Sequence, residues 1–332
     1  MRRGQPFWFL CIFGVLGIVC AVAGTRVVIS LIVVSCIWTM LALSMSVLVG
    51  YAGQVSMGQS GFFAIGAYTS AILTKNFGLP FLASLLGAGV LAGLVGILLG
   101  IPCLRIRGFY LAIATLAFGE IVFVLAGEYT SLTGGFSGFS GIPYASIAGY
   151  VFKPAEGYVY LSLAITFLVL LSGHNLVNSR IGRAFLALNL SEIGTISAGV
   201  NVKRLKIELF GLTAVYCGIA GSLYAHYMLF IGPEFFTGIV PLMAFAACAI
   251  GGIGTIWGSM VGGVVITVLP FALEGYKEWQ PVIWAFLVIA IMILLPRGLF
   301  PGILEFILHR RNPLRAPDVF ANLFRHAKRK ND

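Results

Sequence analysis

Charged side chains are scarce in this 332-residue sequence. Aspartate, glutamate, lysine and arginine make up 10% of it, whereas apolar residues make up 59%. Because charged residues fill about a quarter of an average soluble domain, this scarcity excludes an ordinary soluble protein. Many apolar runs approach the roughly 20 residues that a helix needs to cross a bilayer. The composition therefore predicts an all-α, polytopic helical membrane protein.

Motifs for catalysis and nucleotide binding are missing as well. No lysine follows a glycine, which excludes the phosphate-cradling Walker A loop, and neither an HExxH nor a GxSxG motif occurs. The histidines His174, His226, His309 and His326 do not have the spacing of metal ligands. The sequence therefore predicts no catalytic residue, no metal site and no directly bound cofactor.

Cysteines are few and dispersed. None of the six belongs to a CxxC pair and most lie in apolar segments, so they predict small buried side chains and neither a zinc site nor a disulfide framework. They are Cys11, Cys20, Cys36, Cys103, Cys217 and Cys248.

About ten transmembrane helices are predicted from the apolar runs. The run at 239–252 is short, which indicates a broken or re-entrant piece. The first run ends in Ala21-Val22-Ala23, which resembles a signal-peptidase site, but a retained helix agrees better with the placement of charges. The expected spans are 7–23, 27–49, 58–74, 81–101, 109–127, 157–173, 207–229, 239–252, 255–272 and 281–297.

Basic residues are placed asymmetrically, and the net charge is +10. They cluster near Arg2, near Arg105, at 180–206 and at 297–330. Ten crossings from a cytoplasmic N-terminus place all four clusters and both termini in the cytoplasm, as the positive-inside pattern requires. A nucleic-acid partner is therefore not needed to explain the charge.

This topology predicts a transmembrane domain over residues 1–308 with a glycine-rich external loop at about 128–156. The tail at 309–332 is basic and is expected in the cytoplasm, either solvated or lying along anionic lipid.

Two glycine-rich stretches, Gly50–Leu73 and Gly251–Ile266, differ from ordinary membrane helices. They carry small and polar residues where lipid-facing leucines are expected, and such residues either pack helices closely or face a polar cavity. Two interpretations stay open: a translocation pathway lined by these stretches, and tight helix packing alone. The candidate residues are Gln54, Ser56, Gly58, Gln59, Gly61, Gly66, Gly254, Gly258 and Gly262.

Glu120 stands out because it lies within the expected span 109–127. An intramembrane carboxylate is a candidate functional group, although hydrogen bonding in an interior polar network would also explain it. One rival hypothesis is thus a self-sufficient secondary transporter driven by protons through Glu120. A second rival, an intramembrane enzyme, lacks paired catalytic groups.

The stretch at about 179–206 is too polar to span a membrane. Its first half predicts a short amphipathic helix, which Gly199 would end. Such a helix between two spans could transmit force to or from a soluble partner, or it could lie in the membrane interface. The expected apolar face consists of Ala184, Leu188, Ile193 and Ile196.

Several motifs occur in order over about residues 45–303. They are GYAGQVSMGQSGFFAIGAY, LRIRGFYLAIATLAFGEI, TGGFSGFSGIP, GRAFLAL followed by GVN, GIAGSLYAHY followed by IGPEFF, GGIGTIWGSMVGG and LLPRGLFPG. Together they resemble the LivM-type permease subunits of branched-chain amino acid ABC importers.

The resemblance implies a LivM/LivH-type permease for leucine, isoleucine and valine in a bacterial or archaeal cytoplasmic (inner) membrane. It also implies a second, LivH-like permease, two cytosolic LivG- and LivF-like ATPases that use the ATP, and a periplasmic or lipid-anchored amino-acid-binding protein. The glycine-rich stretches would lie between the two permeases. The amphipathic helix would couple to an ATPase through Gly182, Arg183, Ala184, Leu188, Glu192 and Gly199.

The sequence departs from the family in this coupling segment. Ala187-Leu188-Asn189-Leu190-Ser191-Glu192 stands where relatives usually read Ala-Ile-Arg-Glu-Asn-Glu, so charged groups have been lost. This leaves the cognate ATPase open, as well as a related solute such as urea, an amide or an aromatic acid.

Overall fold

The computed structural model describes residues 26–302, apart from 104, 105, 107, 148, 154–156, 274, 276–278 and 295–297. The expected first span at 7–23, the signal-like Ala21-Val22-Ala23 and the basic tail at 309–332 therefore lie outside the described residues.

Long helices form at the expected apolar spans, with ends that differ by only a few residues. They are α2 (Arg26–Met45), which continues as the π-helical turn η1 (Ser46–Tyr51), α3 (Gln59–Lys75), α4 (Phe81–Cys103), α5 (Phe109–Glu128), α7 (Tyr158–Asn178), α10 (Val202–Met228), α11 (Ile239–Gly251), α12 (Ile256–Ala272) and α13 (Gln280–Leu294).

Short elements connect them: α6 (Thr130–Thr133), η2 (Gly135–Ser137), β1 (Phe139–Ser140), β2 (Ala145–Ile147), β3 (Tyr150–Phe152), α8 (Arg180–Leu190), α9 (Glu192–Ser197), β4 (Phe230–Ile231) and η3 (Pro233–Phe236).

Five of the described helices are long and apolar enough to cross a membrane alone. A sixth candidate span combines α11 and α12, which are bent by 118° at a short break. The bend confirms the expected broken or re-entrant character of 239–252. The all-α polytopic architecture is confirmed, whereas the number of ten crossings stays a prediction.

Close contacts between glycine backbones hold the centre of the bundle together. α10 packs against α3 and α4, while α2 packs against α12, α7 and α10. A Cβ on Gly66 of α3 would collide with the backbone of Gly218 of α10, and a Cβ on Gly221 would collide with the backbone of α3. Because lipid tails are as apolar as leucine, helices in a bilayer associate through such close packing rather than through a hydrophobic driving force.

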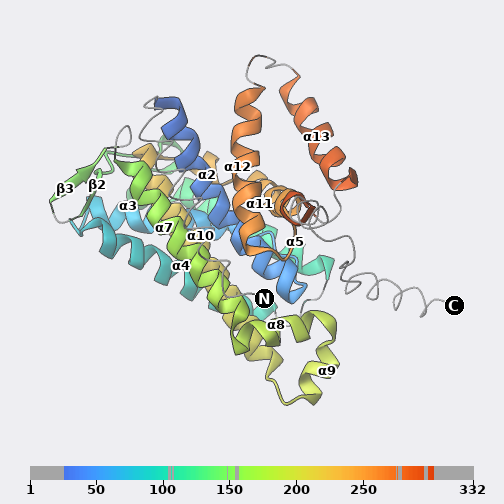
Figure 1. Ribbon diagram of the computed structural model, residues 1–332. Coiled ribbons are helices and arrows are strands. Elements are labelled where there is room, and N and C mark those ends of the chain that lie inside the picture. The colour runs from blue at the N-terminus through green and yellow to red at the C-terminus, as the bar shows by residue number, and fades with distance from the viewer. Residues whose placement is uncertain are drawn as a thin grey trace.

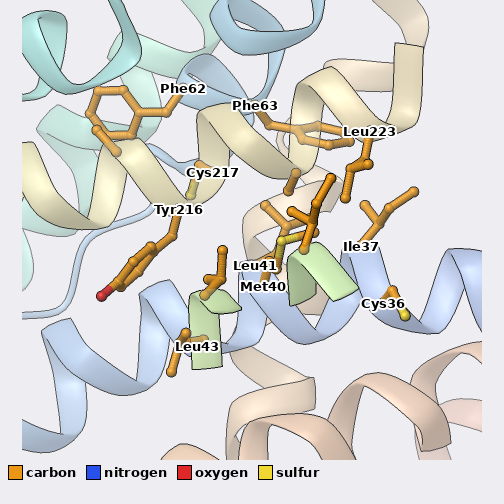
Figure 2. Close-up of a cluster of buried hydrophobic side chains, with 14 of the residues drawn as sticks. Cys36, Ile37, Met40, Leu41, Leu43, Phe62, Phe63, Tyr216, Cys217 and Leu223 are labelled. Carbon is orange, nitrogen blue, oxygen red and sulfur yellow. The ribbon is translucent and has the colours of Figure 1, made fainter. Parts of the chain in front are cut away.

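Apolar side chains fill the space around these crossings. Figure 2 shows Met40 and Leu41 of α2 close to Cys217 and Leu223 of α10 and Phe63 of α3, all members of one buried cluster. The cysteines in the described part of the chain, Cys36, Cys103, Cys217 and Cys248, are buried, as expected.

The expected external loop at 128–156 folds against the end of the bundle at which α7 begins. β1 pairs antiparallel with β4, and β2 pairs with β3 as a hairpin. The ring of His226 on α10 lies 3.0 Å from Ser70 Oγ of α3 and 3.0 Å from the carbonyl oxygen of Pro143. This buried histidine therefore connects two helices to the loop. α8 and α9 lie at the other end of α7 (Figure 1).

Replacement of Gly66 or Gly258 by alanine should destabilise the protein. A Cβ at either position would collide with backbone atoms, and overpacking of this kind costs about 1–3 kcal/mol. Gly58 is the matched control, because its Cβ would meet no atom closer than 3.4 Å. We expect thermal unfolding in detergent to occur at a lower temperature in G66A and G258A than in G58A, and equal melting temperatures would contradict the packing argument.

Candidate functional site

The two glycine-rich stretches meet in space. A Cβ on Gly50, at the end of η1, would collide with the backbone of Gly254, which lies in the turn between α11 and α12. The chain is irregular on both sides of this contact: Gly53, Gly252 and Gly254 all have positive φ, which glycine adopts without strain. The end of the span formed by α2 and η1 therefore touches the break between α11 and α12 through backbone atoms. The π-helical turn η1 is a form that often marks functional sites.

Most of the predicted pathway residues are buried inside this chain. Ser56, Gly58, Gln59, Gly61 and Gly66 are buried, as are Gly258 and Gly262, while Gln54 and Gly254 are partly exposed. The side chain of Ser60 lies directly against Gly119 of α5. Most small residues of the glycine-rich stretches are therefore packed within this chain, against α5, α10 and α11. Their expected position between two permeases stays a prediction.

Gln59 is the most constrained polar residue of the first stretch. It is 2% exposed, and its Nε2 lies 3.6 Å from the sulfur of Met45, while its Oε1 has no hydrogen-bond partner among the described residues. Burial without a partner is costly for an amide oxygen. The unpaired Oε1 of Gln59 is therefore an energetically unfavourable feature of this packing.

The coupling segment consists of two helices, so the expected single helix is wrong. α8 ends at Leu190, and Ser191 caps the N-terminus of α9 by accepting a hydrogen bond from Gly194 N at 3.1 Å. Ser179 caps α8 in the same way through Gly182 N. Gly199 has a φ of 79° and follows α9, which agrees with the expected stop. Serine is a preferred N-cap residue, so Ser191 carried the signal for the break.

The break divides the expected apolar face. Leu188 is 7% exposed and Ala184 packs against the core of the bundle, whereas Ile193 is 80% exposed and Ile196 is 57% exposed. Leu190, which sequence reasoning missed, is 73% exposed. The segment therefore has one face turned to the membrane domain and a separate exposed apolar patch, the α8–α9 patch, formed by Leu190, Ile193 and Ile196.

Asn189 connects the coupling segment to the contact between Gly50 and Gly254. Its Nδ2 donates to the carbonyl oxygen of Gly50 at 3.2 Å, and its side chain lies against Gly53. Asn189 is one of the positions at which the sequence departs from the family pattern. At this position the neutral amide of Asn189 makes a structural contact, because it hydrogen-bonds directly to the backbone of η1.

An ion pair ties the other side of the segment to α10. Lys206 Nζ lies 3.0 Å from Glu192 Oε1, and Lys206 is only 8% exposed. The two residues, together with Gln54, Gly53 and Asn189, line a cavity of about 210 Å³ that also has apolar lining residues such as Leu188. Because a nearly buried ammonium needs a partner, Glu192 fixes α9 to the start of α10.

The remaining candidate residues, Arg183 and Glu120, lie outside these contacts. Arg183 donates to the carbonyl oxygen of Asn178 at 3.4 Å on an exposed surface. Glu120 is partly exposed in the middle of α5, and its Oε1 lies 2.9 Å from the position that a Cβ of Gly238 would take. No hydrogen bond or ion pair of Glu120 occurs with any described residue. The expected alternative, an interior polar network around Glu120, is therefore not found in the described part of the chain.

Comparison with known proteins assigns the architecture to a family. A family model described as the permease component of the branched-chain amino acid transport system matches residues 27–296. This range contains almost all of the described helices, including the bent pair α11–α12 and the coupling segment.

Individual relatives agree with this match. The high-affinity branched-chain amino acid transport system permease protein LivM of Escherichia coli is 34% identical over 288 residues, which cover 80% of this chain and 68% of that protein. A probable LivM of Methanocaldococcus jannaschii is 25% identical, with 80% of this chain and 90% of that protein covered. LivH of Salmonella typhimurium is 24% identical, with 79% and 90% covered.

No solved structure matches the chain. The family match over nearly all of the membrane region, the LivM relative above 30% identity and the glycine-packed bundle of apolar helices lead to one conclusion. This multi-pass membrane protein belongs to the permease component family of branched-chain amino acid transport systems.

Proposed function

We propose that this chain is a membrane permease subunit of an ATP-driven, binding-protein-dependent importer for leucine, isoleucine and valine. The observation that carries the proposal is the family match together with 34% identity to a LivM protein over 80% of the chain. The membrane is the cytoplasmic membrane of a bacterium or archaeon, and both termini lie in the cytoplasm. The basic clusters of the sequence support this orientation.

In this proposal the subunit works with a second permease, two ATPases and an amino-acid-binding protein. A LivH-like permease completes the membrane part, and similarity of this chain to LivH as well as LivM supports a partner of the same architecture. Two cytosolic ATPases use the ATP, and a periplasmic or lipid-anchored protein captures the amino acid. Substrate selection then occurs mainly in the binding protein, and the permease provides a gated conduit.

The α8–α9 patch is the docking surface for an ATPase in this proposal. Leu190, Ile193 and Ile196 expose apolar side chains at the end of the bundle where membrane lipid is not expected, and exposed apolar patches commonly mark interaction sites. Ala184 and Leu188, the residues first expected to dock, pack against the membrane domain instead. Their role is to join the docking surface to the bundle.

Movement of the docked segment has a direct route to the broken helices. Asn189 holds Gly50, and Gly50 contacts Gly254 in the turn between α11 and α12. The Lys206–Glu192 ion pair holds the same segment to α10. A partner can shift a conformational equilibrium only by binding one state better than the other. ATPases that bind the α8–α9 patch more tightly in one state would therefore bias the packing at Gly50 and Gly254.

Reconstitution in liposomes tests the function itself. We expect labelled leucine to accumulate only when the chain is combined with the second permease, both ATPases and the binding protein, and when ATP is inside the compartment that contains the ATPases. A panel of urea, an amide and an aromatic acid tests the substrate class. Accumulation of leucine by the purified chain alone would support the proton-driven rival and would refute the proposal.

Ile193→Asp should weaken ATPase binding without loss of folding, because residue 193 is highly exposed. A hot-spot residue contributes enough that the recovered ATPase should fall by roughly tenfold. Val151→Asp is the matched control, since Val151 is an exposed apolar residue on β3 at the other end of α7. Co-purification of the ATPases from membranes measures the effect. Equal recovery with I193D and V151D would contradict docking at the α8–α9 patch.

Asn189→Ala should separate ATP hydrolysis from transport. The variant keeps the α8–α9 patch and so should retain bound ATPase, but it loses the hydrogen bond to Gly50. We expect fewer leucine molecules imported per ATP hydrolysed. Asn178→Ala is the control, because the Asn178 side chain bonds only within its own helix, to His174. If both variants retain the wild-type ratio, Asn189 has no part in the transmission.

A further inference from the structure

α5 is packed unusually loosely within its own chain. Only 28% of its most apolar stretch is buried, compared with 67% for α10. Large side chains along α5 are therefore exposed, among them Ile113, Ile121 and Val124. In a membrane protein such a face meets either lipid or another protein.

α4 shows what a lipid-facing surface of this chain looks like. Its exposed large side chains are all aliphatic and follow one side of the helix: Leu82, Leu86, Val90, Leu91, Leu94, Ile97, Leu98 and Ile101. The charged residues closest to this helix in the described sequence lie beyond its ends. Lipid tails can cover a surface of this kind, because it has no polar group that needs a partner.

The exposed side of α5 differs because it borders Glu120. At a rise of about 1.5 Å per residue, Glu120 lies about 16 Å from Phe109, near the middle of a helix about 30 Å long. Glu120 is partly exposed, and its carboxylate finds no partner among the described residues. Ionisable residues at this depth almost always face protein or a water-filled cavity, so lipid does not suit this position.

The backbone beside Glu120 gives an independent reason to exclude lipid. η3 ends at Phe236 and α11 begins at Ile239, so Thr237 and Gly238 are not helical, and both are partly exposed. Gly238 lies at the depth of Glu120, because the carboxylate is 2.9 Å from the position of its Cβ. Irregular backbone at membrane depth occurs only where it is covered by protein or lines water.

Water alone does not suit the surface either. Ile239 is 61% exposed and Leu242 is 55% exposed at the start of α11, and Val124 is 53% exposed on α5. A surface that combines a carboxylate, irregular backbone and large apolar side chains matches another protein. We define the α5–α11 seam as Ala117, Glu120, Val124, Gly238, Ile239 and Leu242.

We propose that the α5–α11 seam is the surface against which the second permease packs, which places Glu120 in the wall between the two subunits. The inference rests on the proposed function, since it takes a LivH-like permease as the occupant. The chain matches LivM and LivH proteins over about the same share of its length, so the partner has an equivalent surface and the pair can associate about an approximate two-fold axis. This surface is separate from the glycine-rich stretches, most of whose small residues are buried within the chain.

Site-specific photocrosslinking tests the assignment. Benzoylphenylalanine is introduced at Ala117, an exposed position of α5 one turn before Glu120, and separately at Leu94 on the aliphatic face of α4 as the matched control. Each variant is produced as the full chain together with the LivH-like permease, and the complex is irradiated in its membrane. We expect a covalent product with the combined mass of the two permeases from position 117 and none from position 94.

The outcomes are distinct. Three results would overturn the inference. The first is a crosslink to the second permease from position 94 but not from 117, and the second is a product that joins two copies of this chain at 117. The third is the absence of any product at 117 in membranes where the two permeases co-purify. Failure of the unmodified chain to co-purify with the second permease would instead overturn the proposed function, and the inference with it.

Discussion

Contact between backbones without intervening side chains is the interaction on which this structure depends. In a bilayer, helices gain nothing by hiding apolar surface from lipid, so they associate through close packing and polar contacts. At the crossing of Gly66 with Gly218, and where Gly50 meets Gly254, even one methyl group would not fit. The same contacts connect distant parts of the chain: the turn between α11 and α12 contacts η1, and Asn189 donates a hydrogen bond to Gly50 of η1.

Polar groups in the bundle are arranged by the complementary rule that each needs a partner. Ser70, Ser222 and His226 bond to one another and to Pro143, which joins two helices to the loop. Lys206 is satisfied by Glu192. Glu120 differs from these groups, because no described residue pairs with it. Among the described residues Gln59 Oε1 also lacks a hydrogen-bond partner, but Gln59 is buried. Glu120 instead is partly exposed, on the candidate span with the smallest buried share.

The positions of the helices could be predicted from the sequence because burial in a bilayer requires long apolar runs. The runs at 81–101 and 109–127 correspond to α4 and α5 almost residue for residue, and the short run at 239–252 is half of a bent pair. The coupling segment was less predictable. Helical periodicity placed Leu188 and Ile193 on one face, but the Ser191 cap rotates α9 away from α8 and puts the two residues in different environments. The contact between Gly50 and Gly254 joins residues about two hundred positions apart, and no local pattern specifies such a pairing.

The shortness of α11 affects how the protein is made. Its 13 residues extend about 20 Å, less than the roughly 30 Å of hydrocarbon that a single inserted helix must cross. Insertion of α11 alone into lipid therefore cannot determine its position in the membrane during synthesis. α11 packs against α2 and α3, which leave the ribosome much earlier, and against α12, which follows it directly in the chain. The order of translation thus matters for this fold: the N-terminal helices must already be assembled as a template when α11 and α12 arrive together.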